Sequence, residues 1–302
     1  MIALNFNNIN ELLTLHYEAV KSYVEHTMRE VSKANFHSRV LALSGMEDVS
    51  DADEVDVWLK RFILASPKQL EKWALEEKDK LSFAEMKSLY LNRFSNSPTT
   101  FVDPAGTYNA YTLFKKMGIK TCPYCEHEFI DIVLKEGRER RTMEFDHFYP
   151  KGDDEYPGLA MCFFNLIPSC KPCNQLKMTS PTEASPYDPL IEKMTWIYPD
   201  LELGVNMENV RVEDCKPLLH VTGGMVVNNR SLGLEQKYAN LAPEVYRLLK
   251  NKQQFPEEKL EEMEKMGFGS KEVFRRAFFG APKDEARWHE LHTKMKFDLI
   301  GY

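Results

Sequence analysis

Apolar residues recur at helical spacing through the first third of the chain. From Leu13 to Val31 they lie three or four positions apart, which places them on one face of a helix. Similar patterns predict a helix over Val55–Leu64 and helical structure from Leu70 to Leu91. We therefore expect residues 1–105 to form a helical N-terminal region that serves packing or partner docking. Nothing in the sequence ties its histidines to chemistry: His16, His26 and His37.

The centre of the chain shows strand patterns instead. A short helix from Tyr108 to Met117, ended by Gly118, leads into this part. Apolar and polar residues alternate from Thr142 to His147, and Phe129–Leu134 is a second apolar run. Asp146 and His147 are adjacent, so a regular strand would point them to opposite faces. They can share one site only if the strand ends or bends at this point.

The C-terminal region, residues 186–302, is expected to be mixed and mainly helical. Strands are predicted over Trp196–Tyr198 and Val210–Val212. Gly223-Gly224 predicts a hairpin turn between Leu218–Val221 and Met225–Val227. The remaining patterns predict helices from Leu234 to Leu249 with a kink or restart at Pro243, and over Glu257–Met266, Ser270–Phe279 and Lys283–Leu299. Together these elements indicate an α+β protein that is mainly helical and carries a small accessory hairpin.

Four of the six cysteines form two Cys-x-x-Cys pairs, Cys122 with Cys125 and Cys170 with Cys173. Each two-residue spacer lets neighbouring thiolates converge on one ion, which predicts a structural zinc site. The 44 residues between the pairs exceed the gap of a zinc ribbon, so further structure is inserted there. His127 is an alternative ligand to one thiol. Cys162 and Cys215 lack partners at metal spacing and are expected to be core residues.

The inserted segment and the residues after it hold groups suited to phosphodiester hydrolysis. A neutral imidazole such as His147 can act as a base near pH 7. The carboxylate of Asp146 and an amide oxygen from an asparagine suit a hard cation, Mg²⁺ or Mn²⁺. Such an ion would remain separate from the zinc, which is closed and bound by sulfur.

The order of these residues resembles the HNH (ββα-metal) endonuclease family. The resemblance rests on Cys-Pro-Tyr-Cys, Asp-His shortly before Pro-Lys, Asn-Leu, and a final Cys-x-x-Cys-Asn followed by a lysine, and it covers about a fifth of the chain. It implies a zinc-stapled core over residues 106–185, built from a β-hairpin and one helix. By the same resemblance His147 is the general base, Asp146 a metal ligand, Asn165 the residue that steadies the base, and Asn174 the final metal ligand. Asparagine at that last position corresponds to the HNN variant, and the products would carry 5′-phosphate and 3′-hydroxyl ends.

The amino-acid composition affects what we expect of nucleic-acid binding, partners and cellular location. The chain of 302 residues has a net charge of −7, although duplex-binding proteins are usually basic. Positive residues are nonetheless clustered near the motif, and as nucleic-acid contacts we select Lys171, Lys177, Arg140 and Arg141. The acidic balance indicates weak intrinsic DNA affinity and a partner, an ATPase or another protein, that brings the substrate. No apolar run is long enough to span a membrane, and the cysteine usage fits a reducing cytoplasm.

The sequence thus predicts a metal-dependent HNH endonuclease that cuts DNA, with RNA left open, as an effector in bacterial antiviral defence. The alternative is a zinc-stabilised module that binds nucleic acid or protein and cuts nothing. If the chain is a nuclease, one ring nitrogen of His147 should face a water-accessible cleft.

Overall fold

A computed structural model describes residues 1–49, 55–95, 102–103, 106–152, 154–202, 205–280 and 288–301. The chain separates into two compact units. Unit 1 comprises Met1–Ala3, Lys120–Ile130 and Thr182–Tyr302, and unit 2 comprises Leu4–Ile119 and Asp131–Pro181. The boundaries near residues 105 and 185 that the sequence suggests remain a prediction.

Unit 2 begins with a set of helices around an aromatic core. These helices are α1 (Ile9–His26), α2 (Glu30–Leu41), α3 (Val55–Ile63), α4 (Pro67–Glu76), α5 (Glu85–Leu89) and α6 (Ala110–Met117). Trp58, Phe62 and Trp73 are among the fully buried side chains of this core. A π-helical turn, η3 (Tyr90–Phe94), directly continues α5. Such turns are frequent at functional sites.

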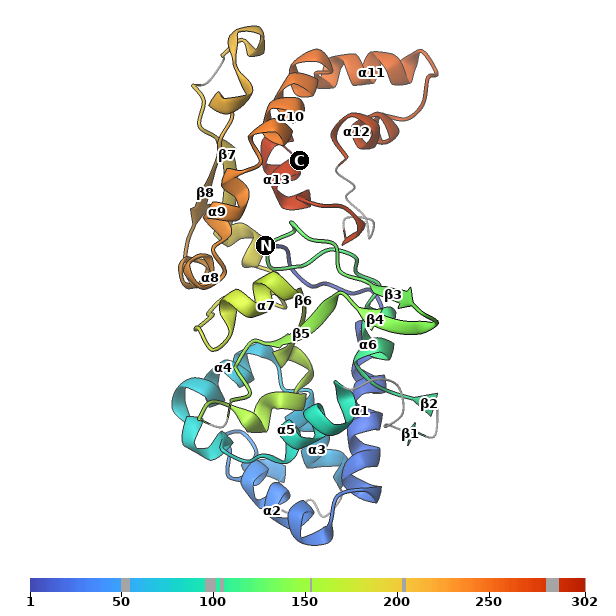
Figure 1. Ribbon diagram of the computed structural model, residues 1–302, viewed down its shortest axis with the longest axis vertical. Coiled ribbons are helices and arrows are strands. Elements are labelled where there is room, and N and C mark those ends of the chain that lie inside the picture. The colour runs from blue at the N-terminus through green and yellow to red at the C-terminus, as the bar shows by residue number, and fades with distance from the viewer. Residues whose placement is uncertain are drawn as a thin grey trace. The chain divides into compact units, whose positions relative to one another are not determined.

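The rest of unit 2 consists of strands and one further helix. Its strands are β1 (Val102–Asp103), β2 (Gly106–Thr107), β3 (Ile132–Lys135), β4 (Arg138–Arg141), β5 (Met143–His147) and β6 (Leu166–Cys170). β3 and β4 form a hairpin whose turn residues, Glu136 and Gly137, both have positive φ. β5 pairs with β6, not with β3, and the register sets His147 opposite Leu166. Helix α7 (Lys171–Lys177) follows β6 at once and packs beside both strands (Figure 1).

The segment between β5 and β6 includes two short 3₁₀ turns, η4 (Pro157–Met161) and η5 (Phe163–Asn165). Helix α5 packs against η4. A Cβ atom on Gly158 of η4 would lie 2.9 Å from the carbonyl oxygen of Leu81 and 2.6 Å from the ring of Phe83. Only glycine therefore allows η4 to approach Leu81 and Phe83 this closely.

Unit 1 contains one strand pair and a group of helices. Its elements include β7 (Thr195–Pro199), β8 (Pro217–Val221), α8 (Met225–Leu232), α9 (Leu234–Ala239), α10 (Ala242–Gln254), α11 (Glu257–Lys265), α12 (Lys271–Phe279) and α13 (Thr293–Ile300). β7 and β8 are antiparallel, with α13 packed on β7 and α9 on β8. Among the described residues, the strands of both units form four two-stranded antiparallel sheets. The expected mixture of many helices and small antiparallel sheets is confirmed.

Three expectations for the C-terminal region were wrong in detail. Met225–Val227 is not a strand, because the chain enters α8 directly after Gly224 and β8 pairs with β7 instead. Val210–Val212 is not a strand either, because its first two residues connect two short 3₁₀ turns and Val212 begins the second of these turns. The last helix begins at Thr293, and the predicted start at Lys283 lies outside the described residues. Pro243 lies in the first turn of α10, so there it restarts the helix.

Candidate active site and metal centre

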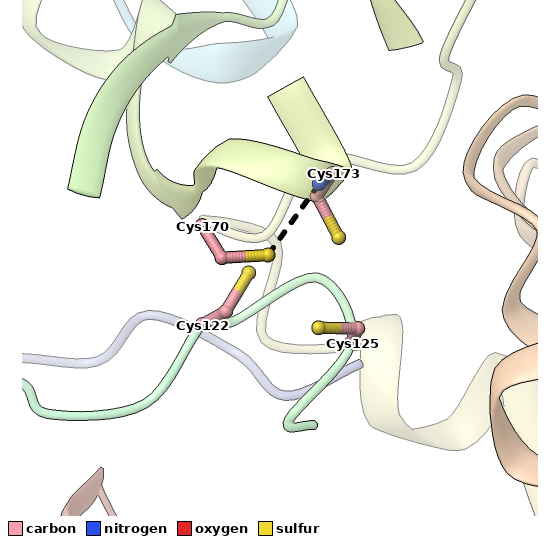
Figure 2. Close-up of side chains that lie close together, drawn as sticks. All are labelled: Cys122, Cys125, Cys170 and Cys173. Carbon is pink, nitrogen blue, oxygen red and sulfur yellow. Dashed lines mark hydrogen bonds between the residues drawn. The ribbon is translucent and has the colours of Figure 1, made fainter. Parts of the chain in front are cut away.

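The thiols of Cys122, Cys125, Cys170 and Cys173 form one cluster, in which all four Sγ atoms lie within 4.8 Å of one another. Figure 2 shows the four side chains directed toward a common point. All four residues are buried and none is in a disulfide. Cys170 caps the N-terminus of α7, where its Sγ accepts a hydrogen bond from the backbone N–H of Cys173. The Sγ of Cys125 accepts one from the N–H of His127.

This cluster fits a tetrahedral metal ion such as zinc. Zn–S bonds of about 2.3 Å in a tetrahedron separate sulfur atoms by roughly 3.8 Å, within the spread observed. Backbone N–H groups that point at sulfur stabilise the thiolate form that binds the ion. His127 is not part of the cluster, and its Nδ1 lies 3.1 Å from Nε2 of His292. The four cysteines that the sequence singles out therefore lie together as a possible metal site, and His127 is not among them.

The remaining two cysteines are buried, as expected. The thiol of Cys162 donates to the carbonyl oxygen of Phe62 at 3.5 Å, and burial raises its pKa. Cys215 is also fully buried, and its pKa is raised for the same reason. Both thiols are therefore protonated core groups rather than ligands.

A second group of polar residues lies within unit 2 at the end of β5. Nε2 of His147 lies 3.0 Å from the carbonyl oxygen of Ala160 in η4. Because a carbonyl can only accept, Nε2 carries the proton and Nδ1 presents its lone pair. Burial, and then the nearby charge of Lys151, hold the pKa of His147 well below its usual value. The imidazole is thus neutral at pH 7, as a general base must be.

The surroundings of His147 differ from the expectation. The residue is only 3% exposed, so neither ring nitrogen faces open water. Nδ1 lies 3.4 Å from the ammonium of Lys151. The ring of Tyr90, from η3, packs edge-on against the imidazole with a centroid distance of 4.4 Å. The predicted water-accessible nitrogen is therefore covered, and the covering groups are a lysine and an aromatic ring.

Asn165 organises the loop that follows His147. Its amide oxygen accepts from the N–H of Tyr149 at 2.7 Å, and its amide nitrogen donates to the carbonyls of Tyr149 and Leu159. Leu159 directly precedes Ala160, whose carbonyl binds His147. The buried asparagine thus links both ends of the segment that surrounds the base, through bonds to the backbone rather than to the imidazole.

Asp146 lies next to Lys177 rather than open to solvent. The Lys177 ammonium is 3.2 Å from one oxygen of Asp146 and 3.3 Å from the other, and it donates to the carbonyl of His147 at 2.7 Å. Lys177 has no exposed surface, so in this structure it faces the interior and not a nucleic acid. It therefore positions the carboxylate instead of offering the surface contact that we expected.

Asn174 and Glu144 form a neighbouring pair. The amide nitrogen of Asn174 donates to Oε2 of Glu144 at 2.5 Å. This bond leaves the amide oxygen of Asn174 as an acceptor. Glu144 and Asp146 are two residues apart on β5, which directs them to the same face of the strand. Two carboxylates and an amide oxygen are the donor set of a hard cation, although Asp146 is already paired with Lys177. The donor groups of these residues are therefore of the types that bind such an ion.

The other three predicted nucleic-acid contacts lie nearer the surface. Lys171 and Arg140 are exposed. Arg141 is half-buried, donates to the carbonyl of Ser95 at 2.8 Å and stacks over Tyr111 with its guanidinium 4.8 Å from the ring centre. Sequence reasoning gave no role to Tyr90, Lys151 or Glu144. The spacing of Glu144 and Asp146 could have pointed to Glu144, and the Pro-Lys dipeptide of the resemblance could have pointed to Lys151.

Comparison with known proteins gives one partial similarity. The chain is 38% identical over 71 residues to the Septu protein PtuB of Bacillus thuringiensis. That stretch is 24% of this chain and 24% of the relative, so the similarity spans about a quarter of either protein. No family model matches the chain, and no solved structure matches it. Within the described residues, no helix is both long and apolar enough to cross a membrane.

Proposed function

We propose that this protein is a metal-dependent HNH endonuclease that hydrolyses phosphodiester bonds in DNA. The hydrogen bond from Nε2 of His147 to the carbonyl of Ala160 carries the proposal, because it leaves Nδ1 as a proton acceptor in a neutral ring. The arrangement of β5, β6 and α7 supports it, since an antiparallel pair followed by a helix is the core that the sequence resemblance implies.

In the proposed reaction Nδ1 of His147 takes a proton from a water molecule. The oxygen of that water attacks phosphorus, and the leaving oxygen keeps the electron pair of the broken bond. Asp146, Asn174 and Glu144 would hold a Mg²⁺ or Mn²⁺ ion, which when bound supplies positive charge for the phosphate and the leaving oxygen. Lys177 holds the carboxylate of Asp146 by both oxygens. Asn165 keeps the surrounding loop in place.

We further propose a cytoplasmic role in bacterial anti-phage defence, together with a protein partner. The partial similarity to the Septu protein PtuB supports the defence role. The net charge of −7 supports dependence on a partner, an ATPase or another protein, that brings the nucleic acid.

A second candidate function is binding without cleavage. The observation that favours it is the covered base, since both ring nitrogens of His147 have protein partners. In this case the four cysteines stabilise a module that recruits other molecules. The two functions make opposite predictions for the same assay.

The test is cleavage of supercoiled plasmid, single-stranded DNA and RNA with Mg²⁺ or Mn²⁺. His147→Ala should lower the cleavage rate by at least about 100-fold, the contribution expected of a general base. His220→Ala is the matched control, because His220 is exposed on β8 in unit 1. Equal zinc content and circular dichroism would show that both variants are folded. Cleavage that persists in His147→Ala would refute the assignment, and binding without cleavage by the wild type would favour the second function.

A further inference from the structure

The lone pair of His147 is covered by one side chain that neither the sequence nor the comparisons assign to the reaction. Nζ of Lys151 lies 3.4 Å from Nδ1 of His147 and 4.9 Å from the centre of the Tyr90 ring. Since Nε2 is bound to Ala160, Nδ1 is the nitrogen through which His147 can accept a proton. A water molecule that reaches Nδ1 must therefore displace the Lys151 ammonium.

The bond that would be displaced is weak. At 3.4 Å it is longer than an ordinary N–H hydrogen bond, and its acceptor is an uncharged ring. Lys151 is half-buried, and loss of water around the ammonium lowers the pKa of Lys151. An incompletely hydrated ammonium readily gives up a weak neutral acceptor for an anionic oxygen. Hydrogen bonds between two charged groups are shorter and stronger than a bond to a neutral ring.

The charges around Lys151 favour an incoming anion over a fixed internal partner. Its ammonium interacts favourably with Asp146 and Glu144, but in the structure Asp146 is held by Lys177 and Glu144 by Asn174. Lys87 and Lys177 repel it. The scissile phosphate must come within a few ångströms of Nδ1, because the attacking water bridges the two. The scissile phosphate would thus be the nearest anion to Lys151 that is not already bound to another side chain.

We propose that Lys151 is a catalytic residue that leaves Nδ1 of His147 when substrate binds and takes a non-bridging oxygen of the scissile phosphate. The proposal rests on the proposed nuclease function and names a further residue of that same site. Lys151 keeps its proton throughout. Water then donates one proton to Nδ1, its oxygen bonds to phosphorus, and the bond from phosphorus to the leaving oxygen breaks. That oxygen retains the electron pair and takes a proton from solvent.

Tyr90 supplies the surface on which this lysine can move. Its ring touches both the imidazole and the ammonium, and its hydroxyl is anchored to the carbonyl of Phe145 at 3.2 Å. The lysine stem has four flexible carbons, so Nζ can shift while the stem stays against the ring. The attraction of the ring for a cation also keeps the charge close to the site.

The kinetic test compares Lys151→Met and Lys151→Arg with the wild type. Lys151→Met removes the charge and should lower kcat about 100-fold with a much smaller change in KM, as expected when a donor to the transition state is lost. Lys151→Arg keeps the charge and should recover most of the rate. The matched control is Lys60→Met, because Lys60 also lies over a tyrosine ring, 5.6 Å from the centre of Tyr17. An unchanged or increased kcat in Lys151→Met would overturn the proposal.

A second measurement does not depend on turnover. The nitrogen chemical shifts of ¹⁵N-labelled histidines are followed while a short single-stranded oligonucleotide with phosphorothioate linkages is added, and His147 is assigned with His147→Ala. In the wild type the Nδ1 signal should move as the lysine bond is lost, and in Lys151→Met it should move much less. His147-dependent cleavage with no difference between these titrations overturns the role of Lys151 alone. No cleavage together with an unchanged Nδ1 signal overturns this role and the proposed function together.

Discussion

The ammonium of Lys177 lies 3.2 Å from the carboxylate of Asp146, and both side chains are buried. Burial of two charges carries a desolvation cost that their mutual attraction offsets, whereas removal of one partner leaves an uncompensated buried charge. Lys177 also donates to the backbone carbonyl of His147, so one side chain of α7 fixes two consecutive residues of β5. The pair connects the position of the candidate metal ligand to the stability of unit 2.

Lys177→Met should therefore destabilise the protein strongly. We expect a loss of about 3–5 kcal/mol in the free energy of unfolding, measured by urea denaturation at pH 7. Lys171→Met is the control, because Lys171 is exposed on the same helix and its change should stay within about 0.5 kcal/mol. Equal stability of the two variants would mean that the ion pair does not form in solution.

Glu144 should affect the metal requirement of the reaction. With Asp146 neutralised by Lys177, the second carboxylate supplies much of the remaining negative charge and holds the amide of Asn174. Glu144→Gln should raise the Mg²⁺ concentration for half-maximal cleavage by about tenfold, as other changes around metal ligands do. Glu136→Gln, in the turn between β3 and β4, is the control. If excess Mg²⁺ fails to restore the rate, Glu144 acts in another way.

The four-cysteine cluster should contain one zinc ion per chain. Cys173→Ser should lose that ion and with it cooperative unfolding, because metal binding and folding are coupled. Cys215→Ala removes a buried thiol outside the cluster and should retain the zinc. The measurement is metal content by atomic absorption together with thermal unfolding. A wild type that folds fully without zinc would contradict this prediction.

Local patterns allowed the sequence to predict the cluster of four cysteines and the strand that ends at His147. The two-residue spacer in each cysteine pair is enough to bring its two thiols together. The alternation from Thr142 to His147 belongs to one strand. Gly223-Gly224 misled because residues that favour a turn here directly precede α8, with Gly223 at positive φ and Gly224 as the residue before the helix. Local signals of this type identify a break in the chain but not the element that follows.

The surroundings of the base could not be predicted in the same way. Tyr90 is more than 50 positions from His147 in the sequence, and only the packing of α5 and η3 brings it there. The carbonyl of Ala160 carries no side-chain signal at all. It is placed by Gly158, whose missing Cβ allows η4 to approach Leu81 and Phe83. The nuclease roles of His147, Asp146, Asn165 and Asn174 remain proposals that these contacts support.

The isolated chain should bind DNA weakly and without sequence preference. Arg140 and Lys171 are exposed, so Arg140→Ala and Lys171→Ala should each weaken binding similarly for all sequences. Each change should also lower the slope of log affinity against log salt by about 1. Fluorescence anisotropy at several salt concentrations measures both quantities. Tight binding that resists salt would show that the chain does not need a partner to reach its substrate.

The stability of unit 2 should depend on pH through His16. This buried histidine donates to the carbonyl of Met161 at 2.7 Å and contacts the hydroxyl of Tyr108 at 2.6 Å. Burial lowers the pKa of His16 from 6.5 to about 4. The unfolded chain therefore binds the proton more readily, so stability is fully present above pH 6.5 and falls as the pH drops toward 4.

The expected loss from this one residue between pH 7 and pH 4 is about 3 kcal/mol, since each unit of pKa difference corresponds to about 1.4 kcal/mol. Urea denaturation of the wild type and of His16→Gln across this range isolates the effect. Glutamine does not titrate, so the variant should be less stable at pH 7 but lose less as the pH falls. The two curves should converge toward pH 4. Parallel curves would show that His16 is protonated as easily in the folded protein as in the unfolded chain, which its complete burial does not allow.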